Sequence, residues 1–394
     1  MPYSSGRRRP EEVPVATSPQ LGGTKKKRRR DPLWARLVVV FGAVLMMVSG
    51  GAIVGVRAIM AKVNSSINNE NLLGDAGVDK GTSIKGPLNV LLVGVDERPD
   101  NDEPVRADSI LILHVPATHD QAYLVSLPRD LLVEIPAFKE NNIAAQRGKI
   151  NAAFALGSEG KGGRAGGFKL LATTIKRVTG IEFNAGAIID FGGFQKVVEQ
   201  LGGVDMCIDQ KVISRHIGFD KNGNYRRPFH GPEQDQRDPL STPVTYEPGC
   251  RRLKPWEALD YVRQRKGLQN GDYDRQRHQQ QFVKAMLKEA KKQGVTTNPK
   301  KALDIIGAAG KALTVDTQGV GIDSWAYTLR NVTDKELLML KTNGGKVNSI
   351  MDPSLGSCEL LTDESRAMFQ AMRGNRVAQF VAEHPDFVNG DAVG

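Results

Sequence analysis

Short, continuous apolar runs are the feature of this chain that most restricts its fold. Three of them are bounded by turn residues and cover residues 88–96, 109–115 and 122–127. Runs of this length fit strands that are buried on both faces of a sheet. A helical pattern follows over Phe168–Val178, a further strand pattern over 185–190, and a helix with a glycine stop over 191–203. This alternation of strands and helices predicts an α/β sandwich.

Two further helices and two irregular segments complete the predicted layout. Pro255 is suited to the first turn of one helix, and a second is expected over Asp272–Lys292. The glycine-rich residues 157–167 predict a mobile loop, and the polar residues 218–248, with five prolines, predict an insertion. Residues 295–394 contain further helical patterns and little that indicates chemistry.

A segment of twenty residues without a charge, Leu37–Val56, predicts a transmembrane signal anchor, since twenty helical residues span about 30 Å. Residues 1–36 carry ten Lys/Arg against three acidic residues, and their composition predicts a disordered tail. That tail supplies +7 of the net charge of +10. Basic residues before the anchor predict a single-pass cell-membrane protein with a cytoplasmic N-terminus, a stalk over 57–87 and an extracytoplasmic remainder. A cleaved signal peptide and a buried core helix are the alternatives.

The chain has three cysteines, and the predicted extracytoplasmic location permits disulfides between them. Cys207 closes a short apolar stretch, and Cys250 directly precedes an arginine-rich block. We expect these two to pair, which leaves Cys358 without a partner. Three buried free thiols are the alternative.

Polar clusters stand at the ends of the three predicted strands. Asp96 and Arg98 follow the first strand, and Asp108 precedes the second together with Arg106 and Ser109. Arg129 and Asp130 follow the third strand. Ligands of open α/β sheets bind at strand ends, so these clusters are expected to converge on one site. Separate surface ion pairs on loops are the simpler alternative for any one cluster.

A second basic set lies farther along the chain. Arg263 and Arg265 are two residues apart, and Arg275 and Gln279 share one face of a helix at spacing i, i+4. A solvated helix face is the alternative. Arginine forks suit phosphate oxygens, and paired aspartates hold a hard divalent cation beside phosphate. Together with the strand-end clusters, this set predicts a pyrophosphate–metal site.

Other familiar chemistries lack their motifs in this sequence. It contains no G-x-x-x-x-G-K-[ST], no H-E-x-x-H and no G-x-S-x-G. Six scattered histidines make a histidine-based zinc site a poor interpretation.

The clusters, in this order and behind the predicted anchor, closely resemble the LytR–CpsA–Psr family of cell-wall glycopolymer ligases. The match covers roughly Leu88–Lys292 and consists of GVDERPD, VRADSI, VSLPRD, GKINAAF, DFGGFQKVVEQLGGVD, ALDYVRQRK and GDYDRQRHQQQ. No one segment is specific, but the collinear series is. The resemblance implies a three-layer α/β/α sandwich around a mixed central sheet. It places the catalytic domain at 88–292 and a C-terminal helical part, packed on or continuing that domain, at 293–394.

The resemblance also implies a Mg²⁺-assisted phosphotransferase. Family members move a glycopolymer, such as teichoic acid, from a polyprenyl-pyrophosphate carrier to peptidoglycan. Asp96 and Asp108 match the metal-associated aspartates, and Arg129 matches the central arginine on the pyrophosphate; these three are the expected catalytic residues. The expected pyrophosphate contacts are Arg98, Arg106, Lys149, Arg263, Arg265, Arg275 and Gln279, with Asp272 orienting the arginines.

The chain departs from the family pattern at His278, where arginine is usual, which predicts a pH-dependent head-group affinity. Two other functions remain open. One is a polyprenyl-pyrophosphate hydrolase that uses water as acceptor. The other is a membrane-bound transcriptional regulator whose basic tail binds nucleic acid. The tail lacks a folded DNA-binding pattern, so we expect no nucleic-acid partner.

Overall fold

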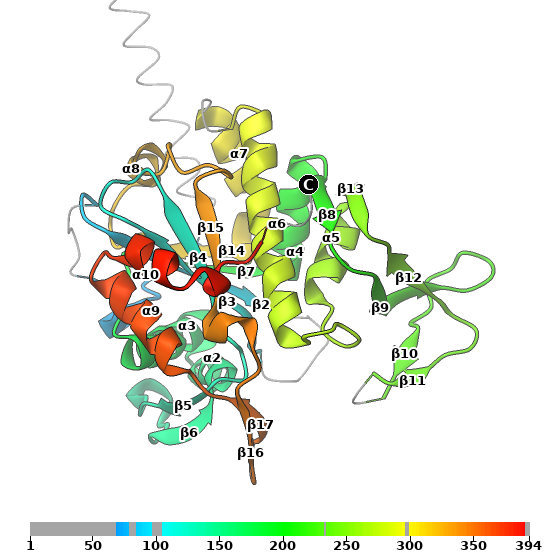
Figure 1. Cartoon of the computed structure of the whole chain (residues 1–394), viewed down its shortest axis with the longest axis horizontal. Helices are drawn as coiled ribbons and strands as arrows, with labels where there is room; N and C mark the ends of the chain where they lie inside the picture. The colour runs from blue at the N-terminus through cyan, green and yellow to red at the C-terminus, as the bar shows by residue number, and fades with distance from the viewer. Residues whose placement is uncertain (1–67, 79–83, 97–104, 232–233, 296–298, 391–394) are drawn as a thin grey trace, which may run out of the picture. The chain divides into compact units, whose positions relative to one another are not determined.

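The computed structural model describes residues 68–78, 84–96, 105–231, 234–295 and 299–390 (Figure 1). The predicted basic tail and the predicted anchor, residues 1–56, lie outside these ranges. Among the described residues, no helix has the length and apolar character needed to cross a membrane.

A seven-stranded mixed sheet forms the centre of the domain. Its strand order is β1 (Asn68–Asn69), β14 (Leu313–Asp316), β7 (Ala185–Asp190), β2 (Leu88–Val95), β3 (Ala107–Val115), β4 (Ala122–Ser126) and β15 (Leu337–Lys341). The pairs β1–β14, β2–β7 and β4–β15 are parallel, and the other three are antiparallel. The three apolar runs therefore form adjacent central strands, and the expected mixed α/β fold is confirmed.

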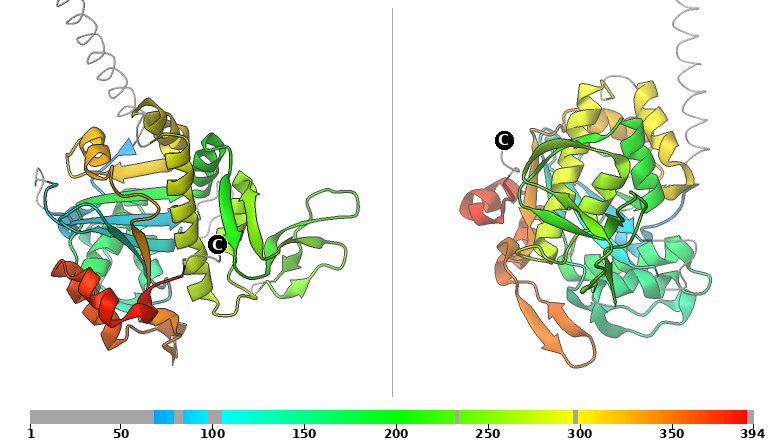
Figure 2. Two further views of the ribbon diagram at one scale, coloured as in Figure 1. Left: turned by 45° about the horizontal axis from the view of Figure 1, so that its top comes forward. Right: turned by 90° about the vertical axis from the view of Figure 1, so that its right-hand side faces the viewer.

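Helices cover both faces of the sheet, as Figures 1 and 2 show. On the face toward Leu91 and Val93 lie α2 (Ile150–Ser158), α3 (Gly163–Thr179), α9 (Asp363–Arg373) and α10 (Val377–Glu383). On the face toward Leu92 lie α6 (Asp272–Lys292) and α8 (Ile322–Thr328). Successive residues of a strand point to opposite faces, so the apolar side chains of β2 contribute to both cores.

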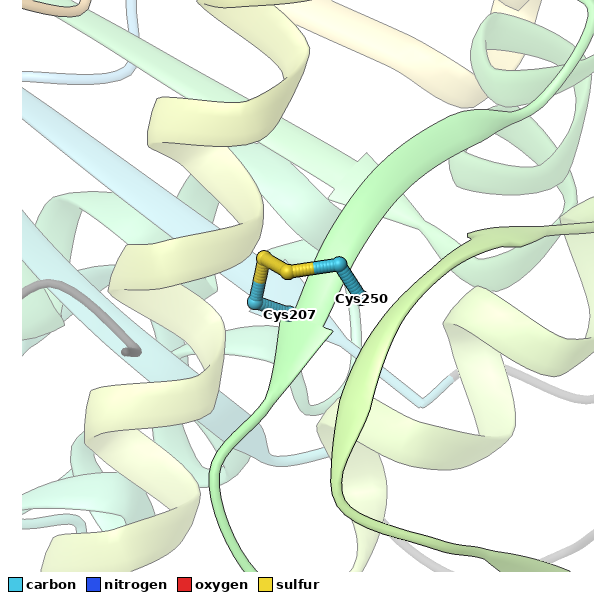
Figure 3. Close-up of a disulfide and its surroundings, with 2 residues drawn as sticks. All are labelled: Cys207 and Cys250. Carbon is cyan, nitrogen blue, oxygen red and sulfur yellow. A yellow bond between two sulfur atoms is a disulfide. The ribbon is translucent and has the colours of Figure 1, made fainter. Parts of the chain in front are cut away.

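A third core lies beside the sheet. It is shared by α4 (Phe191–Gln200), α5 (Pro255–Arg263), α6, α7 (Pro299–Ala309) and the antiparallel pair β8 (Val204–Ile208) and β13 (Gly249–Leu253). Cys207 and Cys250 face each other in this pair and form a disulfide (Figure 3). The expected pairing is therefore present, and Cys358 is a buried free cysteine.

The predicted insertion forms an arm that extends away from the α/β core (Figures 1 and 2). Its strands are β9 (Val212–Phe219), β10 (Phe229–His230), β11 (Gln236–Arg237) and β12 (Thr242–Tyr246). There are also two smaller hairpins, β5 (Leu132–Ile135) with β6 (Gln146–Lys149) and β16 (Ser349–Asp352) with β17 (Gly356–Glu359). Glu359 of β17 accepts a hydrogen bond from the hydroxyl of Tyr273 near the start of α6.

The prediction of a mobile loop over 157–167 is wrong. Gly157 belongs to α2, and α3 already begins at Gly163. The glycines here serve close helix packing: a Cβ on Gly157 would lie 2.4 Å from the carbonyl oxygen of Gly166. A glycine-rich segment is typical both of a flexible loop and of a close contact between two helix backbones. Composition alone therefore does not distinguish the two.

Residues on both sides of the expected catalytic domain, 88–292, also contribute to the fold. In the predicted stalk, the side chains of Leu72 and Leu73 are fully buried, and their backbone N–H groups donate to Oδ2 of Asp316 at 2.8 and 3.1 Å. The predicted helical part over 293–394 supplies β14 and β15 to the central sheet. Residues 68–78 thus pack on the domain, and the C-terminal part continues its central sheet.

Candidate active site

A pocket of about 660 Å³ opens between the sheet and helices α4, α5 and α6. Apolar side chains from all of these elements line it, among them Leu92, Ala187, Phe194, Val197, Phe282 and Met286. Charged side chains line it where β2 and β4 end and β3 begins. The sheet thus provides an apolar floor that leads to a charged rim.

The first ion pair of the rim joins the beginning of β3 to the end of β4. Arg129 donates a hydrogen bond to the carboxylate of Asp108, and both line the pocket. Burial lowers the pKa of Arg129, but the surrounding carboxylates outweigh burial and raise that pKa above its ordinary value; they belong to Asp108, Asp130 and Asp272. Arg129 is therefore a fixed cation in a partly buried position.

The carboxylate of Asp130 forms ion pairs with three basic side chains next to the Arg129–Asp108 pair. Its carboxylate lies 3.2 Å from Nζ of Lys149, 3.6 Å from Nη1 of Arg265 and 3.7 Å from Nε of Arg129. Lys149 reaches it because β6 delivers that residue to the start of α2. The sequence placed Asp130 at a strand end but gave it no role. Its function in the structure is to hold the basic side chains of three separate segments together.

The second side of the rim comes from α5 and α6. Nη2 of Arg263 lies 3.1 Å from Oδ2 of Asp96, and its guanidinium lies 4.0 Å above the ring of Phe191. Nη2 of Arg275 lies 2.6 Å from Oδ1 of Asp272, three residues earlier on α6. These contacts join the end of β2 and the two helices around one opening, as the strand-end argument predicts.

Neutral groups complete the rim. Gln279 accepts a hydrogen bond from Oγ of Ser109 at 2.9 Å and donates to the carbonyl oxygen of Val262 at 3.3 Å. It stands one turn after Arg275, so both point into the pocket, as the i, i+4 spacing predicts.

Not every expected residue reaches the pocket. Lys149 and Asp272 do not line it. Asp272 pairs with the lining residue Arg275, and Lys149 pairs with Asp130, which contacts the lining residues Arg129 and Arg265 from outside the pocket. Arg106 is exposed and away from the lining. Arg98 lies outside the described residues.

His278 is also absent from the lining, and the expectation that it tunes head-group affinity is contradicted by its position. The side chain is fully buried, its ring stacks on Tyr261 at 4.5 Å, and Nε2 lies 3.1 Å from Oδ1 of Asp209. One residue step turns an α-helix by about 100°, so the neighbour of Gln279 faces another side of α6.

The arm contributes Arg215, His216 and Gln234 to the lining, and the sequence did not predict these residues for the site. No spacing pattern connects them with the motifs, because the arm reaches the pocket through tertiary packing. Gln264, directly after α5, is fully buried and joins the same lining.

The residues present fit the expected Mg²⁺. Asp96 and Asp108 emerge from neighbouring strands and line the same rim. No group of three acidic, histidine or cysteine side chains among the described residues is arranged to hold a metal. Mg²⁺ is commonly bound by only one or two carboxylates together with water and substrate phosphates, which is the donor set available here.

The comparisons agree with this geometry. A model of the LytR_cpsA_psr family matches residues 57–366. The chain is 26% identical to the cell wall biosynthesis protein LcpA of Corynebacterium glutamicum, over 78% of this chain and 59% of that protein. It is also 26% identical to the polyisoprenyl-teichoic acid–peptidoglycan teichoic acid transferase TagU of Oceanobacillus iheyensis, over 82% of this chain and 89% of that protein.

The chain thus spans about three fifths of the length of LcpA and, at 61%, of the probable cell wall biosynthesis protein LcpB of the same organism. The crystal structure of TagV from Bacillus subtilis has the same fold, with a TM-score of 0.53 at 18% identity over 75% of this chain and 98% of that one. Because the family model covers most of the chain, including every described segment that builds the pocket rim, this protein belongs to the LytR_cpsA_psr family.

Proposed function

We propose that this chain is a membrane-anchored, extracytoplasmic phosphotransferase that moves a glycopolymer from a polyprenyl-pyrophosphate carrier to peptidoglycan. The observation that supports the proposal is that one pocket has both an apolar interior and a rim of ion-paired arginines. A polyprenyl pyrophosphate has the matching division between a hydrocarbon tail and an anionic head. The name of the related TagU, a teichoic acid transferase, supports the same class of reaction.

In this proposal the apolar interior holds the prenyl tail. Phe194, Phe282 and Met286 offer surfaces without a charge, so burying hydrocarbon there gains roughly 25 cal/mol per Å² removed from water. Residues 37–56, outside the described ranges, would keep the domain at the membrane in which such a carrier resides.

The rim binds the pyrophosphate. Arg129, Arg263 and Arg275 each present forked donors, and their aspartate partners hold them in place before the substrate arrives. A sugar hydroxyl of peptidoglycan attacks the phosphorus that carries the glycan. The bond from that phosphorus to the bridging oxygen breaks, and polyprenyl phosphate leaves with the bond's electron pair. Preorganised cations stabilise the charge that develops on the leaving oxygen.

Asp96 and Asp108 would hold Mg²⁺ together with phosphate oxygens, and the bound ion would supply further neutralisation of the pyrophosphate charge. We assign removal of the proton from the attacking hydroxyl to one of these two carboxylates, which lie where β2 ends and β3 begins. Asp190, the third aspartate of the lining, caps α4 and pairs with Arg164.

Turnover by the full chain in detergent micelles tests the proposal. The donor is a short-chain polyprenyl pyrophosphate bearing a disaccharide, and a muropeptide is the acceptor, with Mg²⁺ or with EDTA. We expect a phosphodiester-linked product that requires both acceptor and Mg²⁺ and is lost in Arg129→Ala. Arg330→Ala removes an exposed arginine that follows α8 and does not line the pocket, and it is the matched control. Cleavage of the pyrophosphate at the same rate without acceptor would establish a hydrolase instead.

A further inference from the structure

Arg215, on β9 of the arm, lines the pocket beside the rim. Its guanidinium lies 4.0 Å above the ring of Phe229, and Nη1 donates to the carbonyl oxygen of Gln234 at 3.4 Å. Its backbone N–H donates to Oε1 of Gln264 at 2.9 Å. Two segments of the arm and the end of α5 thus hold this side chain in one orientation.

Its electrostatic situation differs from that of the other arginines in the lining. Each of the others lies within 4.0 Å of an aspartate; the pairs are Arg129–Asp108, Arg263–Asp96, Arg265–Asp130 and Arg275–Asp272. Among the residues that the structure describes, no carboxylate pairs with Arg215. Its Nε is buried without a hydrogen-bond partner, as are those of Arg129 and Arg275, so the missing carboxylate is what distinguishes Arg215. An oriented cation with an unused donor in a pocket lining is suited to an anion of the ligand.

A buried polar cluster fixes β9 against α5. Oδ1 of Asp260 accepts hydrogen bonds from Oγ of Ser214 at 2.9 Å and from Nε2 of Gln264 at 2.8 Å. All three side chains are almost completely buried. Ser214 precedes Arg215 directly, so this cluster sets the position of Arg215 relative to the rim arginine Arg263, which ends α5.

The position of the arm indicates which anion Arg215 meets. The proposed function places the prenyl tail in the apolar interior and the pyrophosphate at the rim. The glycan must then leave the pocket past the rim, and the arm is the element that extends outward there (Figures 1 and 2). Resting on that function, we propose that Arg215 binds an anionic group of the donor's glycan, a phosphodiester or a carboxylate, next to the pyrophosphate.

Binding of synthetic donors to the full chain in detergent micelles tests this assignment. Four short-chain polyprenyl pyrophosphates serve as probes: one without sugar, one with a neutral disaccharide, one with that disaccharide carrying a phosphodiester, and one carrying a uronate carboxylate. We expect at least one of the two anionic glycans to bind about tenfold more tightly than the neutral one. Arg215→Gln should abolish this preference and leave the Kd of the sugar-free probe unchanged.

Arg237→Gln makes the same charge change on the exposed β11 of the arm and should keep the preference. Phe229→Leu retains the charge of Arg215 but removes the ring beneath it, and should weaken the preference severalfold even if Arg215→Gln fails to fold. Equal affinity of the unaltered chain for neutral and anionic glycans would overturn the assignment. An equal loss for all four probes in Arg215→Gln would make Arg215 a pyrophosphate ligand instead. If the unaltered chain does not bind the sugar-free probe, the proposed function itself fails.

Discussion

Arg263 and Asp96 form an ion pair, Nη2 to Oδ2 at 3.1 Å, across 167 residues of sequence. The pair connects the end of β2 to the end of α5, and Phe191 at the start of α4 lies beneath the guanidinium. About four fifths of each side chain is removed from solvent. Removing either partner therefore leaves a partly buried charge without its counterion, which is more costly than losing an exposed pair.

Asp96→Asn should reduce kcat/KM for glycan transfer by at least about 100-fold, because it removes one of two carboxylates proposed for Mg²⁺ and loosens Arg263. The Mg²⁺ concentration for half-maximal rate should also rise. Asp205→Asn is the control for the charge change, because it breaks an exposed ion pair between Asp205 on β8 and Arg252 on β13. An unchanged Mg²⁺ dependence in Asp96→Asn would exclude this carboxylate as a metal ligand.

Arg129→Lys preserves the positive charge and should still lower kcat by roughly 10²–10³-fold, since an ammonium cannot contact Asp108, Asp130 and a phosphate in the planar geometry of guanidinium. Single-turnover kinetics separate this effect from donor binding. Arg226→Lys makes the same substitution on the arm, outside the pocket lining, where the side chain of Arg226 pairs with Asp238. Equal rates for the two variants would show that charge alone matters at position 129.

The central fold was predictable because continuous apolar runs leave few alternatives to buried strands. The runs that became β2, β3 and β4 lie side by side, and their polar ends converge as expected. The apolar residues Leu337–Leu340 carry the same signal and became β15, yet they were assigned to a helical part. This strand could have been predicted from the sequence, because a short apolar run is typical of a buried strand. In the structure it pairs with β4 in parallel at one edge of the sheet.

Other parts of the site could not be predicted from spacing. Asp130 binds three cations from different segments, and Arg215 reaches the pocket through the packing of β9 on α5. Such contacts depend on tertiary positions that no local pattern encodes. The misjudged loop at 157–167 has a similar origin, because glycine permits both flexibility and close helix contact.

Ala187→Phe should weaken binding of the prenyl tail. Ala187 lies on β7 in the apolar floor of the pocket, so a phenyl ring there would occupy space that the tail needs. The Kd for a long-chain polyprenyl pyrophosphate should rise about tenfold or more, while the Kd for inorganic pyrophosphate stays unchanged. Equal weakening of both ligands would place the tail elsewhere.

Reduction of the Cys207–Cys250 bridge should lower the free energy of unfolding by about 2–4 kcal/mol, because the bridge closes a loop between residues 43 apart. Chemical denaturation with and without dithiothreitol measures the change. The double variant Cys207→Ser, Cys250→Ser should match the reduced protein and show no response to reductant. Cys358→Ala retains the bridge and should keep its sensitivity to dithiothreitol.

Asp260 predicts a pH dependence of stability that is opposite to that of most carboxyl groups. Burial raises the pKa of Asp260 to about 6, against the hydrogen bonds from Ser214, Tyr246 and Gln264 that lower it. Between its unfolded pKa and about 6, the folded state binds more protons than the unfolded state. Stability from this group is therefore greatest below pH 4 and is lost as the pH rises toward 6, by roughly 2–3 kcal/mol.

The side chain of Asn in Asp260→Asn cannot titrate, so the variant lacks this pH dependence. The difference in unfolding free energy, unaltered protein minus variant, should therefore fall by roughly 2–3 kcal/mol between pH 4 and pH 7. Urea denaturation at several pH values measures this difference. Asp238→Asn is the matched control, because the hydrogen bond from Arg226 lowers the pKa of this carboxyl below its ordinary value, and so below that range. If the difference in unfolding free energy for Asp260→Asn changes as little with pH as that for the control, Asp260 stays ionised in the folded protein. Its three hydrogen-bond donors would then offset the cost of burying the charge.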